Sequence, residues 1–207
     1  MDKIICLVGA SGTGKTTIAK ELDKLGYNII HSYTTREPRE ENEWGHIFIP
    51  HIEDMVVSHI DHSGLGIINI QGKHKVKCKG DKLIPYIYYN RQVFAHKELY
   101  GEHYWATKDQ YKNKGTSIYI VDPEGAKQTK QVINDAEIIT IFLTADEEVR
   151  RKRMVDDKER KYPLVTDRLR QDYKIFSKCK CDYVIDANRD IQSIITDIVS
   201  IIGDVDE

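Results

Sequence analysis

The residues best suited to do chemistry stand near the start of the chain, where residues 9–16 read GASGTGKT. This spacing matches the pattern G-x-x-x-x-G-K-[ST] of phosphate-binding loops, or P-loops. Glycines let such a loop curl so that backbone N–H groups point at an anion, and the following helix directs its positive end there. We expect Lys15 to act catalytically on the β- and γ-phosphates of ATP, and the Thr16 hydroxyl to hold Mg²⁺. The expected ATP-binding residues are Gly9, Ala10, Ser11, Gly12, Thr13, Gly14, Lys15, Thr16 and Thr17.

A second group that could bind an anion begins at Ser32, where the sequence reads SYTTREPR. Arg36 and Arg39 stand three residues apart on a loop that Pro38 stiffens. Two guanidinium groups held in this way can grip a phosphate monoester, because each can donate two parallel hydrogen bonds. The alternative is an ordinary solvated loop on which nearby acids neutralise the arginines; these acids are Glu37, Glu40 and Glu41.

Short apolar runs alternate with helical patterns along the chain. The apolar runs that predict strands lie at 4–8, 28–32, 47–49, 117–121, 138–143 and 183–185. Apolar residues at helical spacing follow the P-loop and recur at the end of the chain, where Ile191, Ile194, Ile195, Ile198 and Ile202 form a stripe. This alternation predicts an α/β fold with three layers, in which helices cover both faces of a parallel sheet of about five strands.

The length, net charge and hydropathy of the chain limit which classes of molecule it is expected to bind. The 207 residues suffice for one α/β domain, and 31 Lys and Arg against 33 Asp and Glu leave a net charge of −2, which gives no sign of nucleic acid as the main partner. No apolar stretch is long enough to span a bilayer, so we expect no membrane partner. The sequence begins Met-Asp-Lys and enters a strand at once, and its four cysteines do not form a disulfide framework, which favours a cytoplasmic protein without a signal peptide. The oligomeric state is left open.

The motif SYTTREPR, this far after a P-loop, resembles the signature of the guanylate kinases, a family of P-loop nucleoside monophosphate kinases. Residues 46–48 (HIF) stand in the place of the family's Tyr-x-Phe, and residues 100–107 (YGEHYWAT) resemble its Gly-Asn-Tyr-Tyr-Gly-Thr. Residues 122–126 (DPEGA) resemble its Asp-x-Gln-Gly-Ala/Val turn. The likeness covers about 2–49 and 93–202, and we interpret the chain as a divergent member.

The resemblance implies roles for further residues. An acceptor phosphate would be held by Ser32, Arg36, Arg39, His46 and Tyr104, while Asp122 would lie near the substrate ribose or, through water, near Mg²⁺. Two lid arginines, Arg153 and Arg168, would close over the transferring phosphoryl group. The implied division of the single domain 1–207 is a core (1–32, 108–149 and 169–207), an acceptor-binding subdomain (33–107, with an insertion at about 50–92) and a lid (150–168).

The match is weakest at the positions where guanylate kinases bind the guanine base. Ala95 stands in the place of the family's guanine-reading Glu, and Glu98 is the nearest acid. The implied reaction is ATP-dependent phosphorylation of a nucleoside monophosphate, first of all GMP or dGMP. The alternatives are a kinase for another nucleoside or deoxynucleoside monophosphate, or for ribose 1,5-bisphosphate. An alternative of another class is a non-catalytic guanylate-kinase-like binding module; such modules typically lack an intact P-loop.

Overall fold

A parallel sheet of five strands carries the P-loop at its centre. The computed structural model describes residues 1–49, 55–59, 66–70, 92–99, 101–156, 162–177 and 179–204. The strand order is β11-β10-β1-β9-β2, and all neighbours are parallel. The strands are β1 (Asp2–Gly9), β2 (Asn28–Ile30), β9 (Thr116–Ile120), β10 (Ala136–Thr144) and β11 (Tyr183–Asp186). This sheet confirms the predicted fold class.

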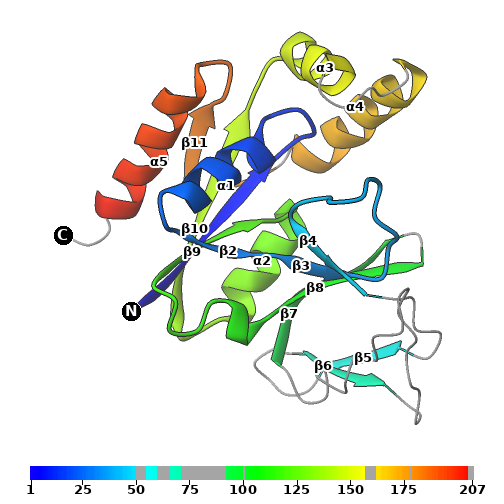
Figure 1. The fold of residues 1–207 in the computed structure, drawn as a ribbon, viewed down its shortest axis with the longest axis vertical. Coiled ribbons are helices and arrows are strands. Elements are labelled where there is room, and N and C mark those ends of the chain that lie inside the picture. Colours follow the sequence, from blue (N-terminus) through cyan, green and yellow to red (C-terminus); the bar gives the residue numbers. More distant parts are fainter. Residues whose placement is uncertain are drawn as a thin grey trace.

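Helices cover both faces of the sheet, as Figure 1 shows. On one face, Ile5 and Leu7 of β1 pack in a cluster that includes residues of α1 (Lys15–Lys24) and α5 (Ile191–Asp204). On the other face, Ile4 and Val8 pack in a second cluster with α2 (Pro123–Val132). Because β1 is buried on both faces, its sequence is a continuous apolar run instead of an alternating one.

A second sheet of six strands extends from the first, in the order β4-β3-β8-β7-β6-β5. Its strands are β3 (Ser32–Thr34), β4 (His46–Phe48), β5 (Met55–His59), β6 (Gly66–Ile70), β7 (Gln92–Leu99) and β8 (Glu102–Thr107). The predicted strand at 28–32 is therefore divided: β2 belongs to the first sheet and β3 to the second. The chain passes between them at His31, whose carbonyl accepts a hydrogen bond from Gln110 Nε2 (2.7 Å).

Aromatic contacts join the two sheets. The ring of Phe94 on β7 meets the rings of Tyr111 and Tyr119 edge to face, at a centroid distance of 5.7 Å in both cases. Tyr111 is fully buried, and its hydroxyl donates to Asp135 Oδ1 (2.8 Å). The predicted insertion at about 50–92 contains β5 and β6, and the rest of it lies outside the described residues. The division into core, acceptor-binding subdomain and lid stays a prediction.

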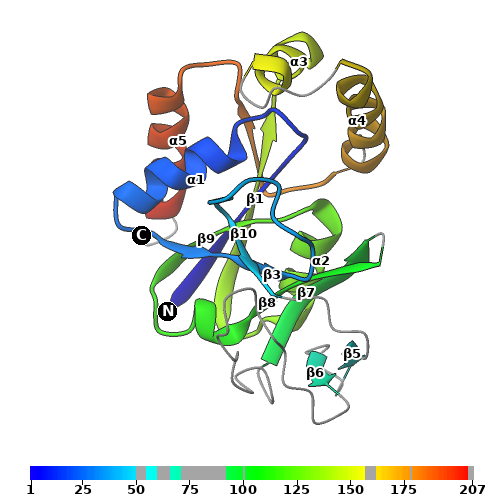
Figure 2. The same ribbon diagram turned by 45° about the vertical axis from the view of Figure 1, so that its right-hand side comes forward.

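Helices α3 (Glu147–Asp156) and α4 (Tyr162–Phe176) overlap the segment 150–168 that is predicted as the lid and extend beyond it at both ends. They pack on each other through Met154, Val165 and Leu169. Figure 2 shows both helices at the end of the sheet that carries the P-loop. Within the described residues, no helix has the length and apolar character needed to cross a membrane.

The lowered pKa of Asp135 lets us predict how the free energy of unfolding depends on pH. Lys108, Lys112 and Tyr111 hydrogen-bond to it and hold its pKa well below the usual value. A carboxylate whose pKa is lower in the folded state stabilises the protein above its unfolded pKa of about 4, and this contribution declines as the pH falls further. Asp135→Asn should therefore lower the free energy of unfolding by about 1–3 kcal/mol at pH 7, and the deficit should shrink at pH 3.

Urea denaturation at both pH values measures this deficit. Glu124→Gln is the control, because its carboxylate is 60% exposed and lies 3.9 Å from Lys127, so the pair contributes little. An Asp135→Asn deficit that is the same at pH 7 and pH 3 would contradict the assignment of the pKa shift to this cluster.

Candidate active site

The P-loop has a backbone that only glycine fits at two of its positions. Gly12 has φ +80° and Gly14 has φ +91°, both in the left-handed region. A Cβ on Gly12 would lie 2.7 Å from the carbonyl oxygen of Arg150. Helix α1 begins directly after Gly14 and has no acidic residue in its first turn. Its positive end therefore stays uncompensated by its own side chains and favours an anion.

The side chains of the loop fit a triphosphate. Lys15 Nζ donates to the carbonyls of Gly9 (2.6 Å) and Ala10 (2.9 Å), so its ammonium lies over the loop. The first helical hydrogen bond of α1 runs from Ile18 N to Gly14 O, which leaves the amides of Thr16 and Thr17 without a helical acceptor. Both threonines are exposed. A loop of this kind can bind phosphate oxygens, and a hydroxyl at Thr16 can bind Mg²⁺.

The structure brings both predicted lid arginines to the P-loop. Arg153 on α3 donates from Nη2 to the carbonyl of Ala187 (3.0 Å) and from Nη1 to that of Gly12 (3.4 Å). Arg168 on α4 donates from Nε to Ser11 Oγ (2.8 Å). Side chains from two separate helices thus converge on one loop.

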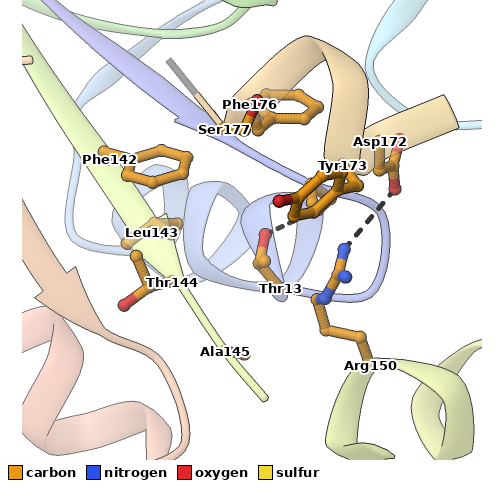
Figure 3. A pocket seen from close by; sticks show the side chains of 11 residues that line it. Thr13, Phe142, Leu143, Thr144, Ala145, Arg150, Asp172, Tyr173, Phe176 and Ser177 are labelled. Carbon is orange, nitrogen blue, oxygen red and sulfur yellow. Dashed lines mark hydrogen bonds and ion pairs between the residues drawn. The ribbon is translucent and has the colours of Figure 1, made fainter. Parts of the chain in front are cut away.

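Sequence reasoning missed a buried ion pair beside the P-loop. Asp172 on α4 is fully buried, and its Oδ2 accepts the backbone N–H of Ser11 (2.7 Å). Arg150 on α3, 9% exposed, places Nη1 3.6 Å from the same oxygen. Figure 3 shows the two side chains pointing toward each other at the wall of a cavity of about 190 Å³. The stacked rings of Phe142 and Phe176 also line this cavity. The only available signal was the four-residue spacing of Arg168 and Asp172.

Two segments with predicted acceptor residues begin at the edge of the sheet that carries the P-loop. In a parallel sheet, the carboxyl ends of the strands lie at one edge, which is where α/β proteins bind their ligands. The P-loop follows β1, Asp122 follows β9, and the chain from β2 continues through His31 into β3 and the loop at 35–45. Topology therefore starts both predicted anion-binding segments at a common edge, and the loop at 35–45 itself joins β3 and β4 of the second sheet.

Ser32, His46 and Tyr104 lie on neighbouring strands of the second sheet. Ser32 is paired with His46 across β3 and β4, and Thr34 is paired with Tyr104 across β3 and β8. The rings of His46 and Tyr104 have a centroid distance of 6.1 Å. The Ser32 hydroxyl is buried and lies 3.3 Å from the hydroxyl of Tyr119. The structure thus gathers these predicted residues.

A carboxylate that the sequence analysis did not single out lies between the two acceptor arginines. Glu43 makes a bidentate ion pair with Arg36, with Nη2–Oε1 at 2.8 Å and Nη1–Oε2 at 3.1 Å. It also accepts the backbone N–H of Arg39 (2.8 Å), whose guanidinium lies 3.9 Å away. The Glu43 side chain is 12% exposed, and these cations hold its pKa below the usual value despite its burial. The clamp therefore already binds a carboxylate from its own loop.

Two buried polar atoms near Glu43 have no hydrogen-bond partner among the residues that the structure describes. Within the described residues, Arg36 Nε and His46 Nδ1 are buried and have no hydrogen-bond partner. Burial lowers the pKa of His46, and the charge of Arg36 lowers it further. The neutral imidazole is therefore favoured, and it can offer one N–H. Such buried polar atoms are costly unless a ligand or water satisfies them.

Among the described residues, no free carboxylate lies at the place where the resemblance predicts the base-reading Glu. Ala95 lies in a β-bulge with φ +51° and is buried among apolar residues. The side chain of Lys97 reaches Asp122 Oδ2 (2.6 Å), while Asp122 Oδ1 accepts from Gly125 N (2.8 Å) and caps α2. Glu98 is exposed. Both oxygens of Asp122 thus have protein partners, and its role toward ribose or Mg²⁺ stays a prediction.

Comparison with solved structures identifies the fold. The guanylate kinase from Anaplasma phagocytophilum has a TM-score of 0.57 at 17% sequence identity, over 98% of this chain and 85% of that chain. A gluconokinase from Sinorhizobium meliloti 1021 has a TM-score of 0.48 at 11% identity, over 99% of this chain and 93% of that chain, too low to support an argument. No protein-family model and no curated protein matches the sequence. The chain has the fold of a P-loop kinase.

Proposed function

We propose that the protein transfers the γ-phosphoryl group of ATP to a nucleoside monophosphate, with GMP or dGMP as the first candidate. One observation carries this proposal: the P-loop follows β1 at the carboxyl edge of the parallel sheet, and the chain that leaves the same edge after β2 leads through β3 to the loop with Arg36 and Arg39. A P-loop alone would support nucleotide binding only. A second anion site would give the phosphoryl group an acceptor, which a kinase needs and an ATPase switch does not.

The residues act mainly by alignment and charge. P-loop amides and Lys15 would hold the donor phosphates, and Arg36 with Arg39 would hold the acceptor phosphate, so that its oxygen attacks directly. When bound through Thr16, Mg²⁺ would neutralise charge on the donor phosphates. Arg153 and Arg168 would stabilise negative charge on the transferring group. Phosphoryl transfer needs little other help from a protein, because its transition state is stabilised chiefly by position and by nearby positive charge.

The residues around Ala95 and Asp122 bear on which acceptor the protein would use. A buried methyl group at Ala95 and an Asp122 already paired with Lys97 favour a second candidate, an acceptor with another base or a sugar bisphosphate. The test is transfer from ATP to a panel of GMP, dGMP, AMP, UMP, dTMP and ribose 1,5-bisphosphate. Turnover of GMP or dGMP alone supports the first candidate, and preference for another member supports the second. Binding of ATP without transfer to any of them would support a switch or a binding module and refute the kinase.

Lys15→Ala separates the enzyme from a non-catalytic module. The substitution removes the cation whose Nζ donates to the loop carbonyls of Gly9 and Ala10, and it should abolish transfer. The unfolding temperature is measured in parallel, so that loss of transfer is assigned to the site only if the variant folds. Transfer is measured by formation of labelled product from γ-labelled ATP. Near-normal turnover in this variant would refute the proposed mechanism.

Arg39→Ala tests the acceptor clamp. The Arg39 side chain is 65% exposed and so contributes little to packing. Its loss should raise KM for the acceptor about 10-fold or more, with KM for ATP changed much less. The control is Arg170→Ala, since Arg170 on α4 is 76% exposed and lies 3.9 Å from Asp167. Equal increases in both KM values would contradict the clamp.

A further inference from the structure

We propose that Asp172 is a positioning residue that aims Arg168 at the transferring phosphoryl group, an inference that rests on the proposed function. Asp172 is fully buried on α4. Its Oδ1 lies 3.3 Å from Arg168 Nε, and its Oδ2 accepts the Ser11 amide (2.7 Å). A buried carboxylate is expensive unless charged and polar partners surround it. All the partners found here belong to the P-loop or to the helices that carry lid arginines.

The Nε of Arg168 has partners in the protein, whereas its two terminal nitrogens are the groups that could bind a phosphate. Nε donates to Ser11 Oγ (2.8 Å) and lies 3.3 Å from Asp172 Oδ1, a buried oxygen that accepts no hydrogen bond from the described residues, so one hydrogen bond and one ion pair orient the guanidinium. Its two terminal nitrogens have no hydrogen-bond partner in the part of the chain that the structure describes, and the side chain is 47% exposed. A guanidinium fixed in this way can present two parallel N–H groups to phosphate oxygens.

Arg150 keeps Asp172 in place from the opposite side. Its Nη1 lies 3.6 Å from Asp172 Oδ2 and has no hydrogen-bond partner among the described residues. Its backbone packs against the P-loop, because a Cβ on Gly12 would come within 2.7 Å of its carbonyl oxygen. The same carboxylate therefore ties α3, α4 and the P-loop together, as the close-up in Figure 3 shows for Arg150 and Asp172.

The geometry gives Asp172 a role apart from contact with substrate. Arg168 and Asp172 are four residues apart on one helix, so their side chains share a face. A positive group that already points at the place where charge develops need not reorganise during the reaction, which is how fixed charges accelerate it. Asn at position 172 keeps the shape and loses the charge. It should leave Arg168 present but poorly aimed.

A double-mutant cycle tests this role. Asp172→Asn, Arg168→Ala and the double variant are compared with the wild type for kcat and KM, using ATP and the best acceptor of the panel. Each single variant should lower kcat about 10- to 100-fold, with KM for ATP changed less than about 3-fold. The double variant should be no slower than Arg168→Ala, because the effect of Asp172 passes through Arg168.

Thermal unfolding of the same four proteins isolates the structural cost. Loss of the Asp172 charge leaves Arg150 buried and unpaired, so the unfolding temperature should fall in both backgrounds. Ser11→Ala is the second variant if Asp172→Asn does not fold. It removes the other partner of Arg168 Nε and should lower kcat only when Arg168 is present. Asp167→Asn is the matched control, since its side chain on α4 is 67% exposed, and it should leave kcat unchanged.

Three results would each be decisive. A kcat loss from Asp172→Asn that is equally large with and without Arg168 would overturn the positioning role and leave a structural one. An Arg168→Ala variant with wild-type kcat would overturn it as well. In both cases the wild type still transfers phosphate, so the proposed function stands. A wild type that transfers to no acceptor overturns the proposed function itself.

Discussion

The candidate site depends on one constraint, the close approach of the P-loop backbone to the elements around it. A Cβ on Gly9 would lie 2.8 Å from the Leu143 carbonyl oxygen on β10, and one on Gly12 would lie 2.7 Å from that of Arg150 on α3. The loop therefore lies closely between strand β10 of the sheet and helix α3. Its amides can point at an anion only because these contacts and the positive φ angles fix the turn.

Both predicted anion sites are lined by carboxylates of the chain itself. Glu43 holds the acceptor arginines, and Asp172 takes a P-loop amide and faces Arg168. The two carboxylates differ in how they can act. Glu43 pairs with the guanidinium groups through which a phosphate would bind, so an acceptor must compete with it. Asp172 Oδ1 lies 3.3 Å from Arg168 Nε, and no described residue contacts the terminal nitrogens of Arg168 by a hydrogen bond. In the proposed reaction, Glu43 would therefore bear on acceptor affinity and Asp172 on the aim of Arg168.

The sequence predicted the first sheet well and the second sheet poorly. Strands β1 and β10 are buried on both faces, so their apolar runs are unmistakable, and the isoleucine stripe of α5 lies against the same core. The run at 28–32 gave no sign of the change of sheet at His31, because that change depends on a distant contact from Gln110. Strand β7 mixes polar and apolar residues around a bulge at Ala95, and its pattern predicts no clear face.

The candidate site was predictable where a motif fixes local geometry. The P-loop, Arg153 and Arg168 come together as expected, and Ser32, Arg36, His46 and Tyr104 share one region. The partner of the arginines was not predictable, since four glutamates stand nearby and only the path of the loop selects Glu43. The ternary complex with an unreactive ATP analogue and an acceptor monophosphate is the most direct test of the account. We predict that the acceptor phosphate replaces Glu43 on Arg36 and lies in line with the γ-phosphate; a complex in which Arg36 keeps Glu43 and the acceptor binds elsewhere would contradict it.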